Sequence, residues 1–246
     1  MDDVLTELPP PSRFFEEDLD NFATPPPSLP PPFLRLNPNP PTLRPSILII
    51  AISAPSLALL RRIAHKTRIG NLILPETNIS SKSCNIYSID RQPSPAIIAA
   101  LNHKVSYERS RAVAKALLDE IRGERVLILD SIKVENYRSR LLTDEAVGFK
   151  LETSSERLGD DRLIRDWEYL PSGSVMAGLG AAMLGECQMR GWKATMCATW
   201  PDNGWSAAAM KLRDVMRDLG FDVDGDDSGD DAEIKVSSRF CSELYA

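Results

Sequence analysis

The last three residues, Leu244, Tyr245 and Ala246, combine an aliphatic side chain, a phenol and a terminal carboxylate in one short segment. Capture of a C-terminal carboxylate is a common mode of peptide recognition. A tyrosine ring buries a large area at a low cost in rotamer entropy, and its hydroxyl supplies a hydrogen bond. This ending therefore predicts a ligand for a pocket on another protein.

An acidic stretch precedes this ending, because residues 222–231 read DVDGDDSGDD. Repelling charges among glycine and serine favour a solvated chain, so we expect residues 222–246 to form an acidic linker and a flexible binding tail. Six oxygen-bearing residues of this region also fall at the ligand positions of a calcium loop. Asp227, however, occupies the position where that loop needs glycine for its turn, so we predict no metal site.

Two other places are candidates for an enzymatic site. Asp130 and Ser131 lie near the polar end of the apolar run Arg125–Lys133, and ligands of α/β proteins bind at the carboxyl ends of strands. The turn that contains Ser172 and Ser174 can be imagined as a nucleophile elbow before a helix. An α/β enzyme that acts on a nucleoside-like small molecule is therefore an alternative to a binding protein.

Other features argue against an enzyme. The chain has only two histidines, His65 and His103, and no GxxxxGK[ST] phosphate loop. Gly178, Gly180 and Gly185 depart from the dinucleotide fingerprint, because the third glycine is misplaced and all three lie inside a predicted helix. We therefore predict no catalytic residue, no cofactor and no metal.

The composition limits the compartment and the partners. The four cysteines are far apart, and Cys187 and Cys197 lie in apolar runs that are typical of buried reduced thiols. The chain has no apolar run of about 18 residues, which a membrane span needs, and its acidic, proline-broken start is not a targeting sequence. The net charge of −6 divides into −4 over residues 1–45, −6 over residues 222–246 and +4 over the rest. We expect a protein of the cytoplasm, and also of the nucleus, that binds neither nucleic acid nor membranes.

Proline separates a leader from the body of the protein. Thirteen of the 19 prolines fall in residues 1–45, which predicts a largely disordered, polyproline-type leader. Residues 46–221 alternate apolar strand and helix patterns. The continuous apolar runs Ser46–Ala54 and Arg125–Lys133 predict strands that are covered on both faces. The body is therefore expected to be α/β, a three-layer αβα domain with a mainly parallel sheet.

The remaining elements are predicted from shorter patterns. Residues Lys133–Asp161 form a long polar excursion with a short helix, and the type of Pro95–Leu101 is left open. Further strands are expected at Ile69–Leu74, Cys84–Ile89, Leu163–Tyr169 and Trp192–Trp200, and helices at Ser56–His65, Arg109–Arg122 and Ser206–Leu219.

The segment Pro171–Arg190 has the densest run of small and apolar residues. We predict a helix that is capped by Ser172 or Ser174, ends at Gly191 and is buried nearly all round. Each glycine inside it costs about 1 kcal/mol relative to alanine. The close approach of another backbone would offset that cost.

This segment and the C-terminal ending resemble a known family, that of proteasome assembly chaperones 1 and 2. The ending Leu244-Tyr245-Ala246 is similar to the hydrophobic–tyrosine–any-residue (HbYX) terminus of such chaperones and of proteasome activators. The resemblance covers most of residues 46–246. Its carriers in the body are Leu170, Pro171, Val175, Gly178, Leu179, Ala181, Ala182, Leu184, Cys187 and the strand Ala194–Thr199.

The resemblance implies a chaperone rather than an enzyme, with a fold related to that of nucleoside phosphorylases but without their active site. Such a protein pairs with proteasome assembly chaperone 2 as a heterodimer. The pair binds assembling α-subunit rings of the 20S core particle and prevents off-pathway association. The tail would enter a pocket of the α ring, and the motif helix would be structural. An adaptor that is recognised through its C-terminus remains a third reading, although PDZ-like grooves prefer a larger last residue than Ala246.

Overall fold

The structure is a computed structural model, and it describes residues 29–37, 43–75, 84–92, 94–138, 147–200 and 205–223. The chain divides into two units between Pro31 and Pro32, and the elements below all belong to the second unit. They form one nine-stranded sheet with the strand order β1-β3-β4-β5-β2-β6-β9-β7-β8.

The centre of the sheet is parallel. It consists of β5 (Ala96–Ala100), β2 (Ile47–Ala51), β6 (Arg125–Ser131) and β9 (Lys193–Trp200). Every residue of β2 and residues 126–130 of β6 are buried. Strands that are covered on both faces carry continuous apolar runs, so the structure confirms the two buried strands that the apolar runs predict.

The flanks of the sheet differ from the prediction. On one side, β4 (Cys84–Ile89), β3 (Lys66–Ile73) and β1 (Phe33–Leu36) are antiparallel to their neighbours. On the other side, β7 (Val147–Glu152) is antiparallel to β9 and parallel to the short β8 (Glu168–Tyr169). The sheet is therefore mixed rather than mainly parallel. Only residues 74–83 separate β3 from β4, and only residues 90–95 separate β4 from β5, whereas a parallel pair needs a crossover of about a dozen residues or more.

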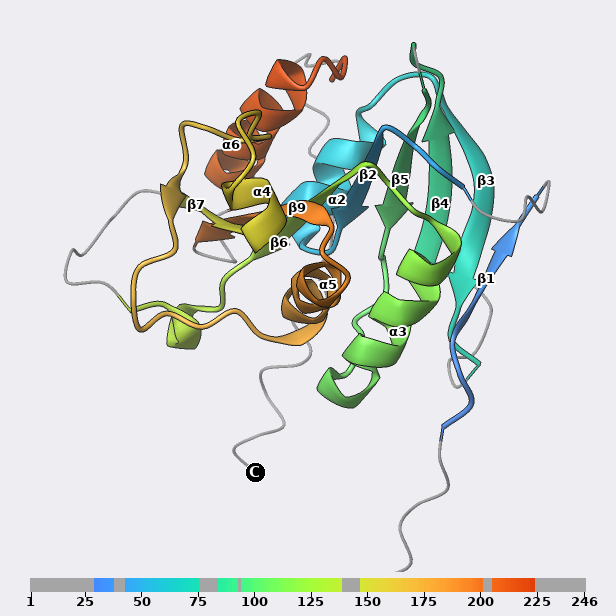
Figure 1. Cartoon of the computed structure of the whole chain (residues 1–246), viewed down its shortest axis with the longest axis horizontal. Helices are drawn as coiled ribbons and strands as arrows, with labels where there is room; N and C mark the ends of the chain where they lie inside the picture. Colours follow the sequence, from blue (N-terminus) through green and yellow to red (C-terminus); the bar gives the residue numbers. More distant parts are fainter. Residues whose placement is uncertain are drawn as a thin grey trace, which may run out of the picture. The chain divides into compact units, whose positions relative to one another are not determined.

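Helices cover both faces of the sheet. Helix α3 (Tyr107–Glu120) lies beside α5 (Gly178–Met189) on one face (Figure 1). Helix α2 (Ala54–Arg61) contacts α6 (Trp205–Asp218) on the other face. Along β2 the buried side chains alternate between the two resulting cores, which agrees with a three-layer αβα arrangement.

The structure contains a strand in each of two segments where none was predicted, the leader 1–45 and the excursion Lys133–Asp161. Residues Phe33–Leu36 fall in the leader that was predicted to be largely disordered, but they form β1, and Leu36 is buried. Residues 1–28 and 38–42 of that leader lie outside the described residues. The excursion Lys133–Asp161 contains strand β7, in addition to the 3-10 turn η2 (Val134–Asn136) and the short helix α4 (Ser154–Arg157).

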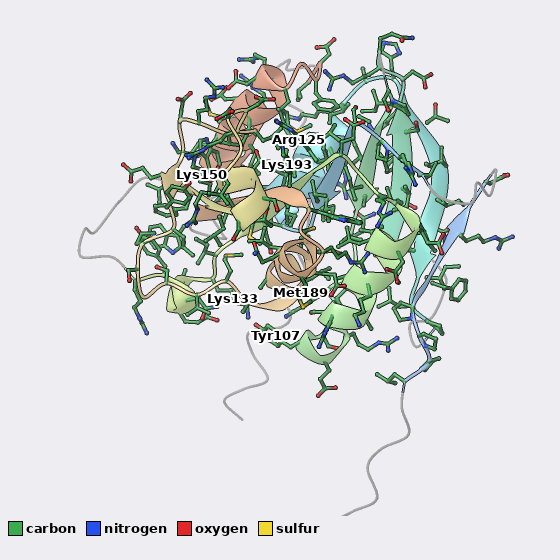
Figure 2. All side chains as sticks on the ribbon, in the orientation of Figure 1. Tyr107, Arg125, Lys133, Lys150, Met189 and Lys193 are labelled. Carbon is green, nitrogen blue, oxygen red and sulfur yellow. The ribbon has the colours of Figure 1, made fainter. Side chains whose placement is uncertain are left out.

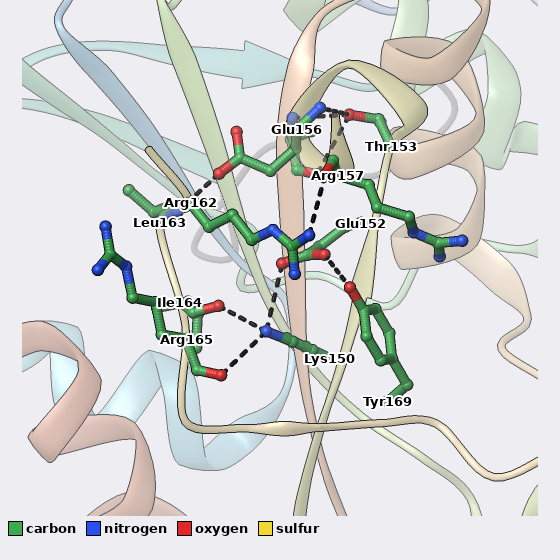
Figure 3. A network of polar contacts seen from close by, with 11 residues as sticks. Lys150, Glu152, Thr153, Glu156, Arg157, Arg162, Leu163, Ile164, Arg165 and Tyr169 are labelled. Carbon is green, nitrogen blue, oxygen red and sulfur yellow. Dashed lines mark hydrogen bonds and ion pairs between the residues drawn. The ribbon is translucent and has the colours of Figure 1, made fainter. Parts of the chain in front are cut away.

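A buried ion pair explains why β7 reads as polar sequence. Lys150 and Glu152 point to the same side of β7, with 3.4 Å between Nζ and Oε1 and side chains only 3% and 0% exposed. Lys150 Nζ also donates to the carbonyl oxygens of Ile164 (2.7 Å) and Arg165 (3.2 Å). The hydroxyl of Tyr169 donates to Glu152 Oε2 (Figure 3). The carbonyls of Ile164 and Arg165 thus accept hydrogen bonds from Lys150 and not from a neighbouring strand. Of the predicted strand Leu163–Tyr169, only Glu168–Tyr169 forms a strand, β8.

We expect Lys150→Met to lower the free energy of unfolding by about 3–5 kcal/mol, because it leaves the Glu152 carboxylate buried without its cation. The matched control is Lys193→Met on the neighbouring strand β9, where the side chain is exposed; its effect is expected to stay within about 0.5 kcal/mol. Urea unfolding of both variants measures the difference. Equal losses would show that the buried pair has no special role.

Candidate functional site

The carboxyl end of β6 lies directly against the first turn of α5. The side chain of Asp130 is nearly buried there, and its Oδ1 accepts a hydrogen bond from the Ser131 backbone N–H at 2.8 Å. A Cβ atom on Gly180 would overlap Asp130 Oδ2 and would lie 3.2 Å from Asp130 Cγ. A close approach therefore accounts for this helix glycine, as predicted, but the neighbour is a carboxylate and not a backbone.

Burial changes the acidity of this carboxyl. Desolvation raises the pKa of Asp130 to about 7, although the hydrogen bond from the Ser131 N–H acts in the opposite direction. Beside it, Ser131 Oγ lies 3.1 Å from Thr199 Oγ1 of β9. A carboxyl that titrates near neutral pH has the acidity of a general acid or base. Gly180, however, occupies the space in front of Oδ2, where a substrate would have to bind.

The second candidate enzymatic residue has a structural partner. Ser174 Oγ donates to the backbone carbonyl of Arg138 (3.1 Å) and accepts from the backbone N–H of Arg138 (2.8 Å). The backbone N–H of Val175 donates to the carbonyl of Asn136 (2.9 Å). The hydroxyl of Ser174 thus holds the loop before α5 to the chain after η2, and no histidine is bonded to it.

The motif helix begins later than predicted. Neither Ser172 nor Ser174 caps it; α5 starts at Gly178, whose φ of +73° favours glycine. Pro171 and Val175 lie in the loop before it.

Burial of this helix is one-sided. Leu179 is buried and Ala181 and Ala182 are half-buried, whereas Gly185 and Met189 are exposed. The prediction of burial nearly all round is therefore wrong on this outer side, because α3 and the sheet cover only the other sides of α5.

A small exposed apolar surface surrounds the start of α5. Tyr107, Val134 and Val175 are 62%, 53% and 55% exposed. Lys133 Nζ donates to the hydroxyl of Tyr107 at 3.0 Å, so the start of α3 and the chain after β6 meet here (Figure 2). We call Tyr107, Lys133, Val134 and Val175 the strand-end surface. Exposed aromatic and aliphatic side chains with a cation beside them are typical of protein contacts.

Sequence reasoning missed most of this surface. Val175 was singled out as part of the motif, whereas Tyr107 and Val134 were not, because an exposed apolar residue leaves no periodic pattern. The tail residues Leu244, Tyr245 and Ala246 lie outside the described residues. Across the described ranges, no group of three or more His, Cys, Asp or Glu side chains is placed to hold a metal ion, and no helix is long and apolar enough to cross a membrane.

Several solved structures share this fold. PbaB of Pyrococcus furiosus, described as an archaeal proteasome activator, matches with a TM-score of 0.58 and 15% identity over 79% of this chain and 91% of PbaB. PbaA of Pyrococcus furiosus, described as an archaeal homolog of proteasome-assembly chaperone, matches with a TM-score of 0.55 and 19% identity over 79% of this chain and 84% of PbaA. A protein of unknown function from Thermoplasma acidophilum matches with a TM-score of 0.52 and 14% identity over 75% of this chain and 80% of its own.

Sequence comparison adds no closer relative. No family model matches the chain, and no curated protein matches it. At identities below 20%, the likeness to these structures shows a common fold.

We expect Gly180→Ala to destabilise the protein by about 1–3 kcal/mol, because its Cβ would force Asp130 or α5 to move. Gly185→Ala in the same helix is the matched control: its Cβ meets nothing within 4 Å, so the substitution should stabilise the protein by up to about 1 kcal/mol. Thermal or urea unfolding distinguishes the two. If Asp130 is the obstacle, Asp130→Ala will reduce the cost of Gly180→Ala, and additive effects would contradict the contact.

Asp130 should also make stability depend on pH. Its pKa is higher in the folded protein than in the unfolded chain, so its contribution is complete below about pH 4 and is lost as the pH rises through about 7. Asp130→Asn cannot titrate. Between about pH 4 and pH 8, we expect wild type to lose on the order of 4 kcal/mol relative to this variant in urea unfolding. Parallel pH profiles of the two proteins would contradict the assignment.

Proposed function

We propose that this protein is an assembly chaperone of the proteasome core particle. The observation that carries the proposal is the fold that it shares, over 79% of its length, with PbaA and PbaB. One is described as a homolog of proteasome-assembly chaperone and the other as a proteasome activator. The resemblance of the motif helix and of the ending Leu244-Tyr245-Ala246 to the chaperone 1 and 2 family supports the same conclusion.

Within that family we assign the chain the role of chaperone 1. It forms a heterodimer with proteasome assembly chaperone 2, and the pair binds α subunits while they form their ring and blocks off-pathway association. We place this activity in the cytoplasm and the nucleus, without nucleic acid or membrane partners. We also expect the fold to be related to that of nucleoside phosphorylases.

The geometry of the strand end favours a binding role over catalysis. Both hydrogen-bonding functions of the Ser174 hydroxyl are used by the backbone of Arg138. Asp130 has a raised pKa, but Gly180 leaves no room for a substrate at its Oδ2. The exposed Tyr107, Val134 and Val175 beside it are suited to a protein partner.

The tail supplies the second contact. The carboxylate of Ala246 pairs with a lysine of the α-ring pocket, the ring of Tyr245 packs there while its hydroxyl donates a hydrogen bond, and Leu244 fills an apolar patch. The chain after Val223 is 23 residues long, and it can reach at most about 80 Å when extended. Once the body has docked, insertion of the tail is effectively intramolecular, so a weak motif adds considerable avidity.

We expect deletion of Tyr245 and Ala246 to weaken binding of purified α-type proteasome subunits by about tenfold or more, because the avidity of the tail is lost. Biolayer interferometry at physiological salt measures the affinity. The unfolding midpoint of the truncated chain should equal that of wild type, because the proposal places the two deleted residues only in the α-ring pocket. Unchanged affinity would contradict the tail mechanism.

One substitution separates this mechanism from an adaptor with a PDZ-like partner. Ala246→Val should leave binding to α-type subunits largely unchanged, because the last position of the ending accepts any residue. A PDZ-like groove would bind the valine variant more tightly. For the enzymatic alternative, an activity on nucleosides that Asp130→Asn abolishes and tail deletion spares would displace the chaperone proposal.

A further inference from the structure

The chain leaves the described body at a well-anchored point. Gly220, with φ of +74°, ends α6, and the next residue, Phe221, is buried. The guanidinium of Arg91 lies 4.5 Å from the centroid of the Phe221 ring and donates to the carbonyl of Leu219 at 3.0 Å. Val223 then pairs with Ile63 in an antiparallel bridge. The segment that starts at residue 224 therefore begins beside the C-terminal end of α2.

Positive charge gathers at this end of α2. Arg61, Arg62 and Arg68 are exposed, and none of them forms an ion pair within the described part of the chain. Lys66 Nζ donates to the carbonyls of Arg61 (2.9 Å) and Ile63 (2.7 Å), which holds the start of β3 against the helix end. Arg68 is two residues further along β3, so it points to the same side as Lys66. We call Arg61, Arg62, Lys66 and Arg68 the basic surface.

The bridge also sets the direction of the outgoing chain. Because Val223 is antiparallel to Ile63, a chain that continues this pairing would run toward Arg62 and Arg61. These residues, 224–231, read DGDDSGDD and carry five aspartates and no basic residue. Five negative charges thus follow Val223 directly in the chain, and the bridge to Ile63 gives them a high effective concentration near the four positive charges of the basic surface.

We propose that the acidic segment 224–231 docks on the basic surface of its own chain. Docking pairs carboxylates with arginines that form no ion pair among the described residues, and the short connection from Val223 makes the contact local. It leaves residues 232–246 to extend from the far end of the docked segment. The docking does not depend on the proposed function; only its consequence, a shorter tether for Leu244-Tyr245-Ala246 of about 50 Å at full extension, rests on it.

Nuclear magnetic resonance on the full chain tests the docking without any proteasome subunit. The heteronuclear NOE of residues 226–231 should be high at low salt, and it should fall in 1 M NaCl, where the screening length is about 3 Å. Replacing both Arg61 and Arg62 by Gln should lower it to the same extent. The backbone amide signals of residues 61–68 should shift in parallel.

The matched control replaces two exposed basic residues of α3, as Arg111→Gln with Lys115→Gln, and should leave the NOE unchanged. Changing the five aspartates of 224–231 to Asn gives the same readout without touching the body, in case the arginine variant does not fold. Equal NOE values in wild type and in the Asn variant would overturn the proposal. So would an arginine variant that keeps the NOE but loses capture of an acidic partner protein, which would assign the basic surface to that partner.

Discussion

The contact between Gly180 and Asp130 determines what the carboxyl edge of the sheet can do. In many α/β proteins this edge is where a ligand binds, because strand ends and helix N-termini converge there. Here the first turn of α5 lies so close to β6 that residue 180 has no room for a side chain. The carboxyl of Asp130 is consequently buried and its pKa is raised. The first turn of α5 therefore closes on Asp130 at this strand end, and the exposed apolar residues Tyr107, Val134 and Val175 lie beside it.

The rest of the fold forms a packed base beneath this edge. The parallel strands β5, β2, β6 and β9 are buried on both faces, with α3 and α5 on one side and α2 and α6 on the other. The ladder with β9 joins the antiparallel strand β7 to this base, and the buried Lys150, paired with Glu152, holds the loop at Ile164 to β7. The same base anchors the outgoing chain through Phe221 and Val223.

The sequence predicts those elements of the fold that are determined by consecutive residues and not by contacts between distant ones. The runs Ser46–Ala54 and Arg125–Lys133 predict strands correctly because continuous burial needs continuous apolar residues. Strand β7 is not predicted from the sequence, because Lys150 and Glu152 are typical of surface positions. Only their pairing with each other makes their burial possible. Strand β1 is not predicted from the sequence either, because it lies among prolines and its strand conformation depends on pairing with β3. At the site, Asp130 is predicted at a strand end, but its neighbour Gly180 is 50 residues away in the chain, and no local pattern connects them.

In the proposed mechanism, the body and the tail bind α-type proteasome subunits together. Affinity capture of the full chain from a cell extract, followed by mass spectrometry of the bound proteins, tests it most directly. We expect α-type subunits and a second α/β chaperone to be captured together. Capture of neither protein by the intact chain would contradict it, and the strand end at Asp130 would then be the place to search for chemistry.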